Sequence, residues 1–168
     1  EGKILSCRIG AGTGNMAVGP AMSREDAIRS VEAGIEVALM LAAETDLFAT
    51  GDMGIANTTP SSAIVSVMTG AAAADVTGRG TGIDDAGLSL KVAVIEKALA
   101  VNRPDPDDAL DVLAKVGGFE IGGIAGVILG AASLRKPVLL DGFISTAGAL
   151  IAQGLAPLAA DYMIAAHK

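Results

Sequence analysis

Residues 46–60 read DLFATGDMGIANTTP and join a strand pattern to a helix start through a polar loop. The apolar run Asp46–Thr50 is short and ends at a glycine, which is typical of a strand buried in a parallel sheet. Thr59 followed by Pro60 is the pattern of a helix start, because proline at the first helical position loses no hydrogen bond. We therefore predict a strand, a loop over 51–58 and a helix capped by Thr59.

The alternation of strand and helix patterns continues on both sides of this unit. Apolar residues recur at helical spacing after Ser23, whose hydroxyl group and the two acidic residues that follow indicate a helix start. Apolar runs over 136–142 and 162–166 predict two more strands. Besides the helix from Thr59 to about Thr69, the patterns predict helices over 23–43, 89–101, 107–116, 122–134 and 145–153, and a loop or lid over 71–87.

This alternation predicts the fold class. Strands that alternate with helices, two of them wholly apolar, are typical of an α/β fold, in which a parallel sheet carries helices on both faces in a Rossmann-like arrangement. We find no repeat and no linker, so residues 1–168 are expected to form a single α/β domain or part of one. Ligands bind such sheets where the strands end. The loops after Thr50 and after Leu140 occupy that place.

The composition limits the classes of function. The chain has 168 residues, with 12 Lys and Arg against 19 Asp and Glu, and a net charge of -7. Nucleic acid is not expected as a partner, because the electric field of a negatively charged protein repels phosphates unless a local patch of basic residues reverses it. The sequence has no such patch. The uncharged runs 53–74 and 142–160 hold several polar residues, which argues against membrane spans. A lone Cys7 and one histidine predict no disulfide, no metal site and a reduced, cytoplasmic setting.

Small residues dominate the chain, with 32 alanines beside 22 glycines, or 54 of 168 positions. Close packing is therefore expected to come mostly from backbones that approach one another. Hydrophobic residues make up 51% of the sequence, which is enough apolar surface for folding. We expect part of that surface to be covered by another subunit or by a further part of the same protein.

The loop over 51–58 offers the groups needed to bind a phosphorylated ligand. An acid follows the strand at once, glycines let a ligand approach the backbone, and hydroxyl and N–H groups gather at a helix start, where phosphates bind. The candidate binding residues are Gly51, Asp52, Met53, Gly54, Asn57, Thr58 and Thr59. The same residue types also form turns and helix caps, and the local sequence leaves both interpretations open.

Two further positions are candidates. Lys91 falls in the first turn of the helix predicted from Ser89, where the helix dipole disfavours a cation. A bound phosphate would remove that conflict, and a solvated surface lysine is the alternative. Asp141 and Gly142 end the strand pattern over 136–142 and fit either a turn or a ligand contact.

Longer stretches resemble a known family. The runs 51–63 and 14–23 closely resemble nicotinate-nucleotide:dimethylbenzimidazole phosphoribosyltransferases, and the stretches 111–121 and 137–143 agree with them. The resemblance covers nearly the whole chain. It implies a glycosyltransferase of cobalamin biosynthesis that transfers the phosphoribosyl group of nicotinate mononucleotide to 5,6-dimethylbenzimidazole or a related base. The products would be alpha-ribazole phosphate and nicotinate, the enzyme a homodimer, and no metal or organic cofactor is implied.

The resemblance also implies roles for two catalytic residues. Asp52 stands where the family usually has a glutamate near the reacting ribose, and it would stabilise positive charge at the anomeric carbon. Lys91 matches a lysine associated with the nucleotide phosphate. The family's general-base glutamate segment has no counterpart here, so we expect the central part of a longer enzyme, inactive by itself. The alternative is a module that binds a phosphorylated nucleotide without turning it over.

Overall fold

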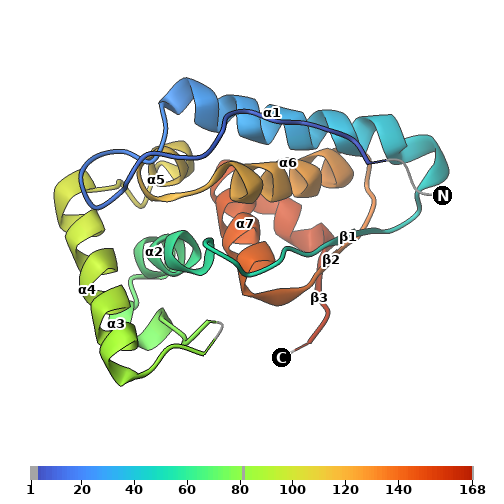
Figure 1. Cartoon of the computed structure of the whole chain (residues 1–168). Helices are drawn as coiled ribbons and strands as arrows, with labels where there is room; N and C mark the ends of the chain where they lie inside the picture. Colours follow the sequence, from blue (N-terminus) through green and yellow to red (C-terminus); the bar gives the residue numbers. More distant parts are fainter. Residues whose placement is uncertain (1–3, 81, 168) are drawn as a thin grey trace.

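The computed structural model describes residues 4–80 and 82–167. Within these residues, three parallel strands form one sheet in the order β1 (Phe48–Thr50), β2 (Val138–Leu140) and β3 (Met163–Ala165) (Figure 1). The register pairs Phe48 with Val138 and Val138 with Met163. The predicted parallel α/β fold is confirmed, with all three strands at their predicted places but shorter.

Helices make up most of the structure. Each predicted helix is present, although the ends differ by a few residues. The stretch 71–87, predicted as a loop or lid, contains a short helix and the start of another, so that prediction is partly wrong; its residue 81 lies outside the described residues. The helices are α1 (Arg24–Leu41), η1 (Ala42–Glu44), α2 (Thr58–Thr69), α3 (Ala73–Val76), α4 (Asp85–Asn102), α5 (Ala109–Val116), α6 (Phe119–Ser133), α7 (Gly142–Leu155) and η2 (Pro157–Tyr162).

The start of α2 differs from the prediction. Asn57 is the residue before the helix, and Thr58 is the first helical residue. Pro60 is therefore the third residue of the helix, and Thr59 is not the cap. The shift moves two threonines into the first turn of α2, beside the loop that carries the candidate binding residues.

The start of α4 also differs, because the helix begins at Asp85 and not after Ser89. The carboxylate of Asp84 caps it and accepts a hydrogen bond of 2.8 Å from the N–H of Gly87. The hydroxyl of Ser89 instead donates to the carbonyl of Asp85 inside the helix, at 2.9 Å. Gly87 is a poor helix former, and it hides this first turn from the sequence pattern.

The helices α1 and α6 lie side by side with their backbones in contact (Figure 1). A Cβ atom on Gly34 would overlap the carbonyl oxygen of Gly123, and one on Gly126 would overlap the carbonyl oxygen of Val31. The same Cβ on Gly126 would lie 2.9 Å from the Cα of Gly34. Close backbone approach, which the composition predicts, is therefore what joins these two helices.

The core extends from helices α1, α2, α4, α5, α6 and α7 to one face of the sheet. Val138 in β2 and Ile151 in α7 are fully buried, and Phe48 in β1 is nearly so. Strand residues alternate between faces, so Ala49 and Ile164 lie on the opposite face, where both are exposed. One face of the sheet thus belongs to the core, and the other is open along its edge strands.

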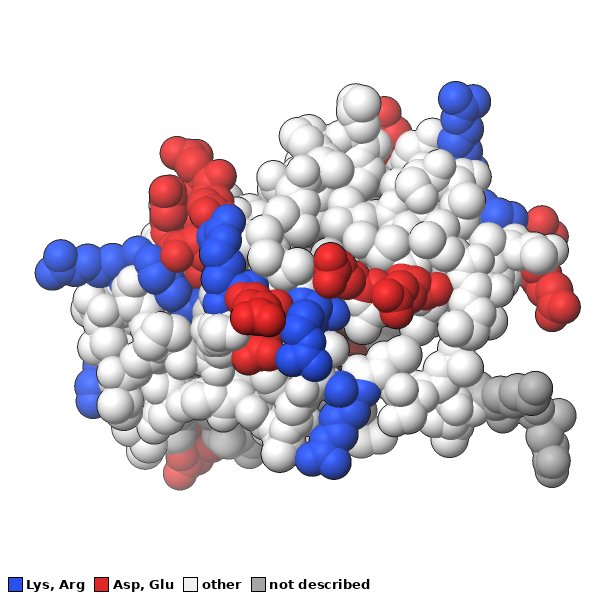
Figure 2. Space-filling model, turned by 90° about the horizontal axis from the view of Figure 1, so that it is seen from above, with Lys and Arg blue, Asp and Glu red and all other residues white. Residues whose placement is uncertain are grey.

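The charges on the surface above α1 are mixed. Figure 2 shows acidic and basic side chains interspersed on this face, with wide uncharged areas between them.

Among the described residues, no helix has both the length and the apolar character needed to cross a membrane. Cys7 is exposed and has a free thiol.

The α1–α6 contact leads to a stability prediction. Gly126→Ala should lower the free energy of unfolding by about 2 kcal/mol or more, because the added methyl group must push two backbones apart. Urea unfolding followed by circular dichroism measures the change.

Gly123→Ala is the matched control in the same helix. A Cβ at Gly123 meets no heavy atom within 4 Å, so this variant should be unchanged or gain up to about 1 kcal/mol from helix propensity. If Gly126→Ala and Gly123→Ala lowered the free energy of unfolding equally, the result would contradict the backbone contact between α1 and α6.

Candidate functional site

The loops after β1 and β2 begin side by side. The N–H of Asp141 donates a hydrogen bond of 3.0 Å to the carbonyl of Thr50. A Cβ atom on Gly51 would lie 4.0 Å from a carboxylate oxygen of Asp141. The structure therefore brings together the two loops that the sequence places at the ends of parallel strands.

Asp141 and Gly142 lead into α7. Gly142 has a φ of 84°, a conformation that favours glycine, and a carboxylate oxygen of Asp141 lies 3.2 Å from Nε2 of His167. Neither Asp141 nor Gly142 lines the pockets described below, whereas the next residue, Phe143, lines one of them. A ligand contact of Asp141 and Gly142 stays a prediction.

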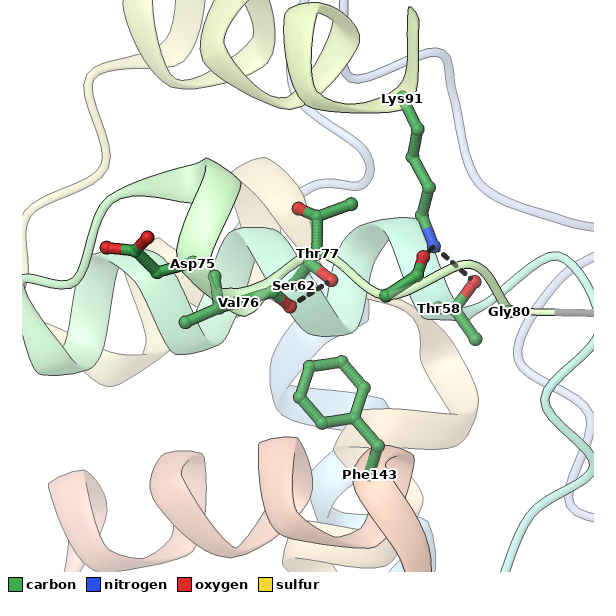
Figure 3. A pocket seen from close by; sticks show the side chains of 9 residues that line it. Thr58, Ser62, Asp75, Val76, Thr77, Gly80, Lys91 and Phe143 are labelled. Carbon is green, nitrogen blue, oxygen red and sulfur yellow. Dashed lines mark hydrogen bonds between the residues drawn. The ribbon is translucent and has the colours of Figure 1, made fainter. Parts of the chain in front are cut away.

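A cavity of about 540 Å³ opens beside the start of α2 (Figure 3). Lys91 reaches down into it from α4, and its Nζ donates to Oγ1 of Thr58 at 3.0 Å and to the carbonyl of Gly78 at 3.2 Å. The ring of Phe143 faces it from α7 (Figure 3). We call this cavity the lysine pocket; its lining residues are Thr58, Ser62, Asp75, Val76, Thr77, Gly78, Gly80, Lys91 and Phe143.

The lysine meets the start of α2 and not the start of its own helix. Lys91 lies in the second turn of α4, so the predicted conflict with the dipole of that helix is wrong. Its ammonium group instead contacts Thr58, the first residue of α2, where helical N–H groups lack partners within the helix and the dipole disfavours a cation. Burial also lowers the pKa of Lys91. A bound anion would relieve both unfavourable effects.

A smaller cavity of about 210 Å³ shares Lys91 and Thr58 with the lysine pocket. Gly54 and Thr59 line it as well, so it gathers four of the candidate residues around the first turn of α2. Arg79 brings a second cation there; its guanidinium pairs with Asp85 and donates to the carbonyl of Ile83 at 3.0 Å. Sequence reasoning missed Arg79, because no spacing pattern links it to α2.

A further cavity of about 450 Å³ is lined by other residues of the loop before α2. It holds two carboxylates, one from this loop and one from the start of α6, and the ring of Phe119. We call it the acidic pocket; its lining residues are Gly12, Thr13, Asp52, Met53, Ile55, Ala56, Asn57, Pro60, Gly117, Gly118, Phe119 and Glu120.

Asn57 holds Asp52 in the acidic pocket. Its Nδ2 donates to a carboxylate oxygen of Asp52 and, at 3.3 Å, to the carbonyl of Met53. The side chain is 6% exposed, and its Oδ1 is buried without a hydrogen-bond partner among the described residues. A buried acceptor without a partner is costly; because this oxygen has almost no accessible surface, it does not open into the pocket.

Glu120 is the second residue of α6, and sequence reasoning did not select it. Its carboxylate folds back against Gly118, where a Cβ atom would overlap it. Although much of the residue is exposed, burial of the carboxyl group raises the pKa of Glu120, and the charge of Asp52 raises it further. The signal that could have found it is the glycine pair before the helix, which leaves room for a carboxylate to turn inward.

No metal centre is suggested by the part of the chain that the structure describes. Residues 4–80 and 82–167 contain no group of three or more His, Cys, Asp or Glu side chains that could hold a metal ion. The charged groups that these residues bring to the three pockets are two cations at a helix start, the carboxylate of Asp75 in the lysine pocket and two carboxylates beside a buried amide.

Curated proteins with closely similar sequences exist. The chain is 68% identical over 167 residues to the nicotinate-nucleotide–dimethylbenzimidazole phosphoribosyltransferase of Syntrophotalea carbinolica. It is 66% identical over 170 residues to the protein of the same name from Desulforudis audaxviator. Each match covers 99% of this chain and 47% of the relative. The chain therefore spans about half the length of the curated relatives it matches.

Solved structures and a family model agree with these sequences. The crystal structure of CobT from Thermus thermophilus matches with a TM-score of 0.89 at 42% identity, over 97% of this chain and 49% of that one. A crystal structure of the nicotinate-nucleotide–dimethylbenzimidazole phosphoribosyltransferase from the same organism matches with a TM-score of 0.86 at 40% identity, over 95% and 47%. A family model described as phosphoribosyltransferase matches residues 1–168. The chain therefore belongs to this phosphoribosyltransferase family.

Proposed function

We propose that this chain forms the nucleotide-binding part of an enzyme that transfers the phosphoribosyl group of nicotinate mononucleotide to 5,6-dimethylbenzimidazole or a related base. The products would be alpha-ribazole phosphate and nicotinate, a step of cobalamin biosynthesis. Family membership supports the reaction class. The observation that carries the proposal is the ammonium group of Lys91 at the first turn of α2.

The phosphate of the nucleotide is assigned to the first turn of α2. An anion there would accept hydrogen bonds from the N–H groups of Thr58 and Thr59 and would neutralise Lys91. It would replace the hydroxyl of Thr58 and the carbonyl of Gly78 as the partners of that ammonium group. Arg79, on the wall of the same small cavity, adds positive charge.

The reacting ribose is assigned to Asp52. During transfer, the bond from the anomeric carbon to the nicotinate nitrogen breaks, and a bond from that carbon to a benzimidazole nitrogen forms. Positive charge develops on the sugar between these events, and a fixed carboxylate stabilises it. Asn57 fixes the carboxylate of Asp52 by donating to it. The benzimidazole N–H proton must also leave, and we assign no residue of this chain to that step.

We also propose that residues 1–168 form a single α/β domain, the central part of a longer catalytic domain, in a cytoplasmic homodimer. The chain covers 47% of the length of the curated relatives, which supports the proposal that it is part of a longer catalytic domain. Large apolar side chains that remain exposed support further covering contacts; among them are Val18, Met53, Ile55 and Leu158.

Nicotinate mononucleotide binding tests the phosphate assignment. Lys91→Met removes the charge but keeps the aliphatic chain, and it should weaken binding about tenfold or more, because a hydrogen bond to a charged group contributes about 1.5–3 kcal/mol. Isothermal titration calorimetry measures the affinity. Lys97→Met, an exposed position on the same helix, is the matched control and should bind as the parent does. Equal affinity in all three proteins would remove Lys91 from the phosphate site.

Turnover tests the role of Asp52. In a chimera, this chain replaces the matched residues of the Syntrophotalea carbinolica relative, which supplies the other segments. Asp52→Asn should slow nicotinate release from the mononucleotide and dimethylbenzimidazole by about 100-fold or more, because the sugar then lacks its fixed negative charge. Asp52→Glu keeps the charge and should retain most of the activity. An Asn variant as fast as the parent chimera would exclude Asp52 from the mechanism.

A further inference from the structure

Three hydroxyl side chains lie on one face of α2. Thr58, Ser62 and Ser66 are four residues apart, which places them on the same side of a helix. A serine inside a helix commonly donates to the carbonyl four residues before it, and the hydroxyl of Ser61 does so, at 2.9 Å from the carbonyl of Asn57. The three hydroxyls on this face have hydrogen-bond partners outside α2 instead.

The chain that follows α2 turns back along this face. The hydroxyl of Ser66 donates to the carbonyl of Ala71 at 2.7 Å. Closer to the start of α2, the hydroxyl of Ser62 donates to the carbonyl of Val76 at 3.0 Å (Figure 3). We call residues 71–80 the returning segment. Two serines therefore attach it to α2 at successive turns of the helix.

The returning segment meets Lys91 near the first turn of α2. The carbonyl of Gly78 accepts a hydrogen bond of 3.2 Å from Nζ of Lys91, which also donates to Oγ1 of Thr58 at 3.0 Å. A Cβ atom on Gly80 would lie 3.5 Å from the same Oγ1. The ammonium group is thus held between the returning segment and α2, and its position depends on where the segment lies.

Ser62 fixes the part of the returning segment that reaches Lys91. Val76, its partner, is two residues before Gly78, and two residues of chain span at most about 7 Å, so a shift of Val76 carries over to Gly78. Thr77, between them, is held as well, because its hydroxyl donates to the carbonyl of Ala73. Since Ser62 is fully buried although it borders the lysine pocket, its hydroxyl acts on the segment and not on a ligand.

We propose that Ser62 is a positioning residue, which holds the ammonium group of Lys91 at the start of α2 through Val76 and Gly78. The consequence for phosphate binding rests on the proposed function, whereas the position of the ammonium group does not. Without the hydroxyl, the carbonyl of Val76 loses its partner, the segment moves away from α2, and water reaches the ammonium group. A cation that is not held in place binds an anion at the helix start less tightly, because binding must then order it.

The side chain of Lys91 reports its own position without any ligand. Burial lowers the pKa of Lys91 in the parent chain. Ser62→Ala should raise this pKa toward the usual lysine value of about 10.4, because water then reaches the ammonium group. A pH titration followed by NMR of 13C-labelled lysine side chains measures it, and the signal missing from Lys91→Met assigns the resonance.

Ser61→Ala is the matched control. Ser61 is also fully buried and is the neighbour of Ser62 in α2, but its hydroxyl donates within the helix. This variant should leave the pKa of Lys91 unchanged. A rise as large as that in Ser62→Ala would contradict the proposal.

A double-mutant cycle tests the consequence for nicotinate mononucleotide. By isothermal titration calorimetry, Ser62→Ala should weaken binding about fivefold, and Ser61→Ala should bind as the parent does. In a chain that already carries Lys91→Met, Ser62→Ala should cause no further loss, because Ser62 acts through Lys91. A general loosening of the fold would instead cause the same loss with and without Lys91.

Two results would overturn the proposal: an unchanged pKa of Lys91 in Ser62→Ala, and equal losses of affinity in the two backgrounds. If the nucleotide does not bind to the parent chain, the proposed function fails, and the pKa of Lys91 still decides whether Ser62 holds it. Ser62→Cys, which keeps a similar size and a weak donor, replaces Ser62→Ala if circular dichroism shows that variant to be unfolded. It should raise the pKa in the same direction by a smaller amount.

Discussion

The backbones of α1 and α6 touch at Gly34 and Gly126, and the position of the site depends on this contact. At one end of α6, the first turn places Glu120 at the acidic pocket. At the other end, the N–H of Lys136 donates to the carbonyl of Ala131, and β2 follows directly. A change in the spacing of the two helices would therefore move both the carboxylate and the strand that sits beside β1.

The residues around the loop over 51–59 divide its surroundings into a positive and a negative part. Lys91 and Arg79 lie at the first turn of α2, whereas Asp52 and Glu120 share the acidic pocket. In the proposed nucleotide, the anionic phosphate matches the positive part of these surroundings. This match supports the proposed ligand, and it explains why a lysine whose pKa is lowered by burial lies so near this loop.

The sequence was informative wherever the signal was local. Apolar runs located all three strands, and they also predicted that the loops after Thr50 and Leu140 lie where the strands of a parallel sheet end and ligands bind. Local signals failed at α4, where Gly87 masks the first turn. They also could not show that the ammonium group of Lys91 contacts the start of α2, because its hydrogen-bond partner Thr58 is 33 residues away in the sequence. Glu120 has only a weak local signal, the glycine pair before α6, because the residue it shares a pocket with, Asp52, is far away in the sequence.

The most direct measurement of where the nucleotide lies is a crystal structure of this chain with nicotinate mononucleotide. The account predicts the phosphate within hydrogen-bond distance of Nζ of Lys91 and of the first N–H groups of α2, with the ribose beside Asp52. A phosphate bound elsewhere, with Lys91 still donating to Thr58 and Gly78, would contradict it.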